Sequence, residues 1–157
     1  MRIAVVFYSE TGHTLSVAEL IQAALKAGGH EAVLHRLVAV GTAHPGAKDV
    51  KFESLPDLTG YDRIIFGAPV QAFSLCPVMD AYLVSAPSMV GKRAVLFMTE
   101  GFPYPWMGGN RAIAKMEGLL RSKGAQTKKA GVVNWMRTDR PRLIEKVVAS
   151  VAEAAVS

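Results

Sequence analysis

The sequence has almost no cysteine and no long apolar run. Its 157 residues include one cysteine, Cys76, so no internal disulfide can form and no cysteine cluster can hold a metal. No apolar run reaches the length that a bilayer span requires. Met1 and Arg2 lead directly into a short strand-like run, with no signal-peptide cleavage site. These absences predict a cytoplasmic protein in a reducing environment, without membrane insertion.

Arrays of catalytic side chains are missing as well. The chain offers no persuasive Ser/His/Asp arrangement and no persuasive pair of carboxylates for acid–base chemistry. The histidines His30, His35 and His44 lack the spacing of metal ligands. We therefore predict no metal site and no catalytic side chain.

An excess of positive charge is confined to the end of the chain. Lys and Arg number five against six Asp and Glu in residues 1–60, three against three in 61–110, and ten against four in 111–157. The excess indicates either a docking face for an acidic partner, since charge of one sign steers association, or solvated helix faces. Nucleic acid is disfavoured, because no aromatic residues interleave with cations such as Lys128 and Lys129.

Strand-like and helix-like segments alternate along the chain. Strands are expected at residues 2–8, 31–37, 62–68, 92–98 and 126–133. Helices are expected at residues 14–27, 77–86, 110–123 and 140–155. This alternation predicts an α/β domain with a parallel sheet, and the length predicts one domain over residues 1–157. Residues 38–60 break the alternation with Pro45, Gly46 and Pro56, so we predict a long irregular connection with at most a short helical turn.

The stretch that follows the first predicted strand has the features of an anion site. Its residues are Ser9, Glu10, Thr11, Gly12, His13 and Thr14. A helix start exposes unpaired backbone N–H groups and binds phosphate without Lys or Arg, and this stretch contains neither. The alternative is an ordinary helix cap, which needs only one hydroxyl. Three hydroxyls and a glycine favour a phosphate-type ligand.

The same stretch resembles the signature of the flavodoxin family. Val5-Val6-Phe7-Tyr8-Ser9 fits its aliphatic, aromatic and hydroxyl positions, Gly12 and Thr14 fit the small residue and the threonine, and Ala18 and Ile21 fit the helix. The resemblance implies a flavodoxin-like, doubly wound five-stranded sheet in the order 2-1-3-4-5, with helices on both faces. It also implies FMN at the point where the strand order reverses.

The resemblance assigns parts of the chain to parts of FMN. Residues Ser9 to Thr14 would hold the phosphate. Loops after the third and fourth strands would flank the flavin ring, and their candidate residues are Pro69, Val70, Gln71, Ala72 and Phe73 on one side and Thr99, Glu100, Gly101, Phe102 and Tyr104 on the other. One or two of Phe73, Phe102, Tyr104 and Trp106 are expected to touch the flavin.

Several residues depart from the family pattern or leave alternatives open. Gln71 stands where the family often has Trp, and residues 68–76 contain no Gly whose peptide could flip toward the flavin N5. Strong stabilisation of the neutral semiquinone is therefore not expected. His13 would either add a donor or charge at the phosphate or point into solvent. Glu100 would lie near the flavin or be an exposed loop residue.

The resemblance implies a non-covalent FMN-binding electron carrier with redox protein partners, whose chemistry belongs to the cofactor. Such partners would be acidic if they dock on the basic residues 111–157. The main alternative is an FMN-dependent NAD(P)H:quinone or flavin reductase on the same fold. A third hypothesis is an interaction module that has lost FMN, since a fold alone does not decide a function.

Overall fold

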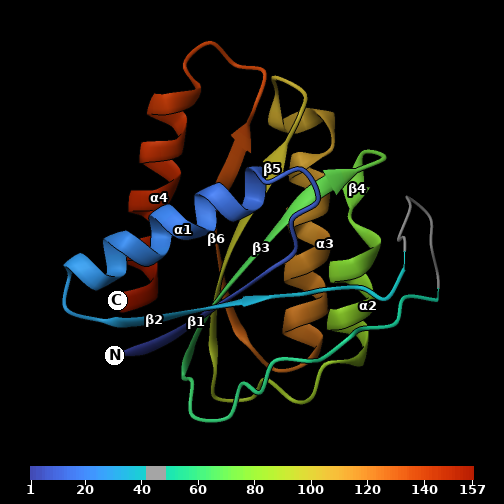
Figure 1. Ribbon diagram of the computed structural model, residues 1–157, viewed down its shortest axis with the longest axis vertical. Helices are drawn as coiled ribbons and strands as arrows, with labels where there is room; N and C mark the ends of the chain where they lie inside the picture. Colours follow the sequence, from blue (N-terminus) through green and yellow to red (C-terminus); the bar gives the residue numbers. More distant parts are fainter. Residues whose placement is uncertain (42–48) are drawn as a thin grey trace.

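A β-sheet forms the middle layer of the molecule (Figure 1). The computed structural model describes residues 1–41 and 49–157. The strands are β1 (Arg2–Phe7), β2 (Glu31–Arg36), β3 (Arg63–Gln71), β4 (Ser74–Leu75), β5 (Arg93–Glu100) and β6 (Gln126–Asn134). Five of them are parallel in the order β2-β1-β3-β5-β6, and the short β4 pairs antiparallel with β3. The predicted strand order is confirmed, and β4 is an addition that the sequence did not indicate.

Helices cover both faces of the sheet (Figure 1). They are α1 (His13–Ala27), α2 (Pro77–Ser85), α3 (Gly109–Ser122) and α4 (Arg140–Val156), with a single 3₁₀ turn, η1 (Pro105–Met107). The helices α1 and α4 pack on one face, and α2 and α3 pack on the other. The four predicted helices are confirmed to within one residue at each end. Among the described residues, no helix combines the length and the apolar character needed to cross a membrane.

The central strand β1 shows why both faces are covered. Its residues Ile3, Val5 and Phe7 enter the apolar cluster beneath α1 and α4. The alternate residues Ala4 and Val6 enter the cluster beneath α2 and α3. Because successive side chains of a strand point to opposite faces, a continuous apolar run requires a layer on each side.

A close contact between neighbouring strands needs glycine in β3. Gly67 pairs with Phe97 of β5, and a Cβ atom at residue 67 would lie 2.0 Å from the ring of Phe97. No real Cβ contact is that short, so the Phe97 ring occupies the space above the glycine. This contact fixes how β3 and β5 pack at the centre of the sheet.

The connection between β2 and β3 is irregular in its described part, as predicted. Ala39 and Phe52 form an isolated antiparallel bridge, and the Phe52 ring meets the edge of the Tyr82 ring of α2 at 6.2 Å. Leu58 and Tyr61 are buried in the core. These apolar contacts take the place of a crossover helix. The predicted breakers Pro45 and Gly46, and also His44, lie outside the described residues.

Candidate functional site

The predicted site residues gather at one edge of the sheet. The segments that follow β1, β3, β5 and β6 leave the sheet at the carboxyl ends of these strands (Figure 1). Two predicted boundaries were wrong. Pro69, Val70 and Gln71 continue β3, because Val70 and Gln71 find ladder partners in β4. Thr99 and Glu100 likewise belong to β5, where they pair with β6.

The loop after β1 presents backbone donors at the start of α1. Gly12 has φ of +90°, a left-handed conformation that glycine adopts without a steric penalty. No described residue accepts a hydrogen bond from the N–H groups of Thr11, Gly12, His13 or Thr14. Four neighbouring donors at a helix N-terminus, with no acceptor among the described residues, suit an anion such as phosphate.

The three hydroxyls of this loop do not play equal parts. Ser9 is buried, and its Oγ accepts a hydrogen bond of 3.2 Å from the N–H of Leu15. The hydroxyl of Thr14 is buried too and lies 2.7 Å from the hydroxyl of Thr99. Only Thr11 is exposed. Ser9 caps the helix and Thr14 connects it to β5. The hydroxyl of Thr11 is therefore the one of the three that forms no hydrogen bond with a described residue.

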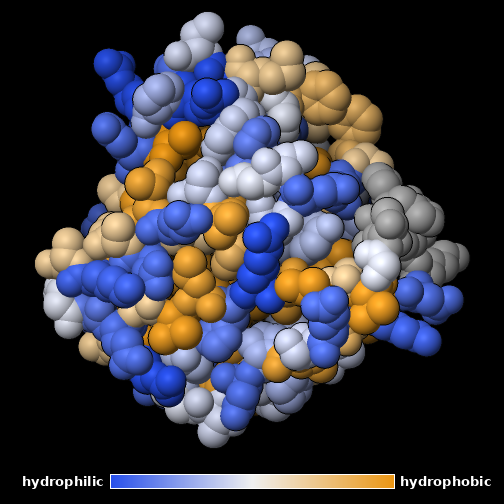
Figure 2. Space-filling view, viewed as in Figure 1, coloured by the Kyte–Doolittle hydropathy of each residue, from blue (hydrophilic) through white to orange (hydrophobic). Residues whose placement is uncertain are grey.

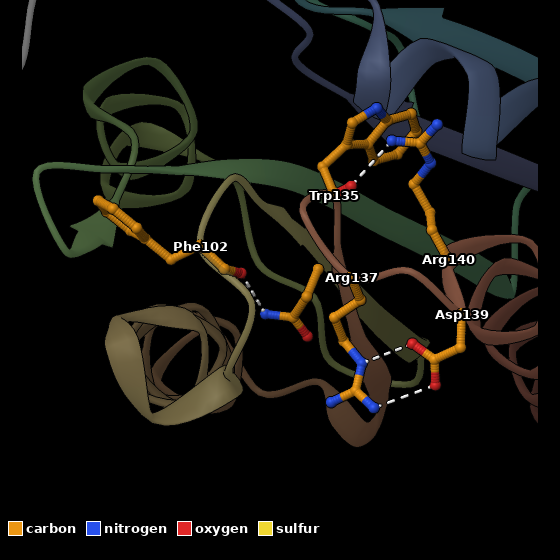
Figure 3. A network of polar contacts seen from close by, with 6 residues as sticks. Phe102, Trp135, Arg137, Asp139 and Arg140 are labelled. Atoms are coloured by element: carbon orange, nitrogen blue, oxygen red, sulfur yellow. Dashed lines mark hydrogen bonds and ion pairs between the residues drawn. The ribbon is translucent and has the colours of Figure 1, made fainter.

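His13 takes a position that neither sequence interpretation described. Its ring stacks on the indole of Trp135, with centroids 3.9 Å apart and planes 10° apart. The guanidinium of Arg140 lies over the same indole, 5.0 Å from its centroid, and donates to the Trp135 carbonyl at 2.8 Å. Figure 3 shows Arg140 reaching from the start of α4 to Trp135. The stack therefore joins the loop after β1 to the segment after β6.

This stack also affects the charge of His13. Partial burial lowers the pKa of His13, and the positive charge of Arg140 lowers it further. The ring is therefore mainly neutral at neutral pH. Its contribution at this edge is a flat surface and a hydrogen-bonding nitrogen rather than a positive charge.

A tight hairpin joins β3 to β4. Its two central residues, Ala72 and Phe73, have φ of +49° and +60°. Two left-handed residues between antiparallel strands are typical of a type I′ turn, which normally contains Asn or Gly. Neither Ala nor Phe is favoured there, so this hairpin stores backbone strain. Gln71, just before the turn, donates from Nε2 to the carboxylate of Glu10 and so connects the hairpin to the loop after β1.

Four aromatic side chains of the two ring loops form two stacked pairs. Phe73 and Phe102 have centroids 5.3 Å apart and planes 5° apart, so the loop after β3 touches the loop after β5. Tyr104 and Trp106 form the second pair, at 5.7 Å and 8°. All four are exposed. A flavin placed between Phe73 and Phe102 would have to separate them.

Glu100 is neither an exposed loop residue nor a free carboxylate at the edge. It is 2% exposed, and its Oε2 accepts a hydrogen bond of 2.9 Å from Asn134 Nδ2. Its carboxyl group also accepts a hydrogen bond from the N–H of Gly109 at the start of α3. Its Oε1 is buried without a partner among the described residues. Burial raises the pKa of Glu100, and the two hydrogen bonds oppose that rise. Glu100 thus caps α3 from a neighbouring strand.

Several residues that shape this edge were missed by the sequence interpretation. Asn134 donates to both Glu100 and the Phe102 carbonyl, at 2.9 Å each, and Arg36 donates to the Ser9 carbonyl at 3.0 Å. Trp135 and Arg140 form the stack with His13. A signal was present: Arg36, Asn134 and Trp135 end or follow predicted strands, and parallel strands end at one edge.

Other reactive groups lie away from this edge or are inert. Cys76 is fully buried, and burial raises the pKa of its thiol to about 12, so it acts as a small apolar side chain. In the part of the chain that the structure describes, no three His, Cys, Asp or Glu residues come together as a metal site.

Comparison with known proteins identifies the fold. No protein-family model matches the sequence, and no curated protein matches it. The structure, however, is similar to solved structures over nearly its whole length. A flavodoxin of Streptococcus pneumoniae TIGR4 matches with a TM-score of 0.71 and 17% identity, covering 99% of this chain and 98% of that one. The chain has the flavodoxin fold.

Further flavodoxins support the same assignment. Flavodoxin 2 from Bacillus cereus, solved in its oxidised form, matches with a TM-score of 0.66 and 22% identity over 98% of this chain and 99% of that one. The two-electron reduced flavodoxin of Megasphaera elsdenii matches with a TM-score of 0.68 and 22% identity over 97% and 99%. In open α/β sheets, ligands generally bind outside the carboxyl ends of the strands, which is the edge just described.

Proposed function

We propose that this protein binds FMN without a covalent bond and carries electrons. The observation that carries the proposal is the set of N–H groups from Thr11 to Thr14, which donate to no described residue and are held by the left-handed Gly12 at the start of α1. These donors suit a phosphate monoester. Similar structures of the flavodoxin fold have been solved in oxidised and in two-electron reduced form, which supports a redox role for this one.

The remaining residues would bind and orient the cofactor. FMN supplies the electron chemistry when bound, and the chain needs no catalytic side chain for it. Phe73 and Phe102 offer apolar ring surface to the flavin. The hairpin at residues 72–73 brings backbone donors and acceptors to the same place. In this proposal the protein is cytoplasmic, where the single cysteine stays reduced.

One observation favours the reductase alternative. A cleft of about 390 Å³ opens beside the loop after β5, lined by Pro103, Tyr104, Met136, Arg137, Thr138 and Asp139. It offers room for part of a second substrate next to the proposed flavin site. An FMN-dependent NAD(P)H:quinone or flavin reductase would use such a space.

Titration of the apoprotein with FMN and with riboflavin tests the proposal. We expect FMN to bind much more tightly than riboflavin, because only FMN has the phosphate that the N–H groups would bind. Failure to bind micromolar FMN would overturn the proposal. Steady-state oxidation of NADH or NADPH with a quinone then separates the two functions: a carrier shows negligible turnover without a separate reductase, whereas a reductase turns over alone.

A further inference from the structure

The positive charge of residues 111–157 does not form one face. The lysines Lys123, Lys128 and Lys129 lie where α3 ends and β6 begins, at the amino edge of the sheet. The arginines Arg111, Arg137, Arg140 and Arg142 lie at the carboxyl edge, in the first turns of α3 and α4 and in the segment after β6. Within β6, Lys128 lies six residues before Asn134, the last residue of the strand, so roughly 20 Å separates the two groups at about 3.3 Å per residue. Only the arginines are close to the proposed FMN site.

Exposed apolar side chains lie at the same edge as these arginines, and Tyr104, Met136 and Arg137 line one cleft there. Trp106 is 73% exposed and Met136 is 69% exposed, and Phe102 and Tyr104 are exposed beside them. Figure 2 shows an apolar area at the upper right, where Figure 1 places the loops after β3 and β5, next to a hydrophilic group at the upper left, where α4 begins. Large exposed aromatic groups within a polar rim are typical of protein interfaces.

The rim carries net positive charge, because Arg111, Arg137, Arg140 and Arg142 outnumber Asp139 and the exposed Glu10, which Gln71 holds at the same edge. Asp139 is the only exposed carboxylate between Glu100 and the first turn of α4, and it is held by Arg137 through contacts of 2.8 and 3.0 Å (Figure 3). Arg140 is held over Trp135. Arg111 and Arg142 are exposed and form no ion pair with a described residue. Two guanidinium groups therefore face solvent with their fork of donors available, and this geometry matches carboxylates.

We propose that the surface made of Phe102, Tyr104, Trp106 and Met136, with the arginines Arg111, Arg137 and Arg142 around it, docks an acidic redox protein. The inference rests on the proposed function, since the surface borders the proposed flavin ring site and would bring the partner's redox centre to it. Charge complementarity selects the partner. A second copy of this chain packed by a two-fold axis would place arginines against arginines.

A first experiment needs no flavin. Trp106 is far more exposed than Trp135, whose indole lies between His13 and Arg140, so ionic quenchers in solution report mainly on Trp106. Iodide should quench the apoprotein about twofold more than caesium, each normalised to N-acetyltryptophanamide, because a positive rim concentrates anions. Equal normalised quenching would overturn the proposal. This result does not depend on whether FMN binds.

A second experiment uses an acidic [2Fe–2S] ferredoxin as the protein probe. Each reduced ferredoxin gives one electron, so two of them, with protons from the solvent, bring bound FMN to its two-electron-reduced form. The double variant Arg111→Glu/Arg142→Glu should slow this transfer about tenfold at about 0.1 M salt, where the Debye length is about 10 Å. Both residues lie in the first turn of a helix, where Glu is favourable, so the variant should fold.

A matched variant controls for the change in the net charge of the protein. Lys26→Glu/Lys128→Glu makes the same charge change at the amino edge and should slow transfer less than about twofold, since that edge lies beyond the Debye length. Equal slowing by both variants would overturn the proposal, as would a concentration-dependent dimer that Trp106→Ser abolishes. FMN affinity, measured on each variant, shows separately whether the proposed function itself fails.

Discussion

The loop after β1 and the loops after β3 and β5 line the same edge, but they are built differently. The loop after β1 is made by consecutive residues: Ser9 caps the helix start, and Gly12 turns the chain into it. The other two loops depend on distant partners. Phe73 meets Phe102, and Glu100 holds Asn134 and the start of α3. The loop after β1 has distant partners too, Trp135 for His13 and Thr99 for Thr14, but the turn into its helix is encoded locally. The other two loops are held by tertiary contacts, and substitutions can test this difference.

The largest effect is expected at Gly12. Gly12→Ala places a Cβ on a residue with φ of +90° and should reorient the neighbouring N–H groups. We expect FMN affinity to fall about a hundredfold in a fluorescence titration, which corresponds to roughly 2.7 kcal/mol. Riboflavin affinity should change little. Gly118→Ala, at an open position in α3, is the control. An equal loss of FMN and riboflavin binding would argue against a phosphate role.

The second-largest effect is expected at Trp135, and it tests whether the loop after β1 depends only on residues near it in the sequence. Trp135→Leu removes the ring on which His13 stacks, a contact worth about 1 kcal/mol. FMN affinity should fall about fivefold. Trp106→Leu, which changes an exposed indole on another loop, should leave that affinity nearly unchanged. If Trp135→Leu has no effect, the loop does not depend on the segment after β6.

The contact between the two ring loops can be measured by a double-mutant cycle. Phe73→Ala, Phe102→Ala and the double variant should show a coupling free energy of about 1 kcal/mol in urea unfolding of the apoprotein. Saturating FMN should change this coupling, because a flavin between the rings would separate them. Additive effects in the apoprotein would mean that the stacked pair does not hold the loops together.

A substitution in the strained hairpin at residues 72–73 should increase the free energy of unfolding. Ala72→Gly should relieve the left-handed strain, about 1–2 kcal/mol, against the entropy cost of glycine, about 0.5–1 kcal/mol. A net stabilisation of about 0.5–1 kcal/mol is expected from the urea midpoint. The same substitution at Ala149, in the exposed middle of α4, should instead destabilise by about 1 kcal/mol. Destabilisation by both would contradict the turn assignment.

The smallest effect is a pH dependence at Glu100. Because folding raises the pKa of Glu100, its contribution to stability is fully present below the ordinary pKa of Glu, about 4.3, and is lost as pH rises through the higher folded pKa. The stability of the wild type relative to Glu100→Gln should therefore fall across that range. Glu145→Gln, on the exposed side of α4, is the control. A difference that is constant with pH would show that Glu100 is not the titrating group.

The fold could be predicted because the same sequence patterns, apolar runs and helical periodicity, recur along the chain. Apolar runs separated by helical periodicity gave the strands and helices to within a few residues, and the motif from Val5 to Ile21 indicated their order. The two-residue β4 could not be predicted, because it exists only as the partner of Val70 and Gln71. Its turn, moreover, lacks the Asn or Gly that marks such hairpins in a sequence.

The candidate site was predictable in position more than in detail. The phosphate-type loop could be located because backbone donors at a helix start need no distant partner. The role of Glu100 could not, since it depends on Gly109 and Asn134, nine and 34 residues further along the chain. The same holds for Trp135, whose stacking on His13 joins residues at opposite ends of the sequence.

The contact between Gly67 and Phe97 limits how this sequence can diverge. A side chain at residue 67 has no room while the Phe97 ring lies above it, so a smaller residue at 97 must come before any larger one at 67. Substitutions at these two positions would accumulate in that order and not in the reverse. The residues found at positions 67 and 97 in related proteins of this fold would thus show that the strand β5 changed before the strand β3.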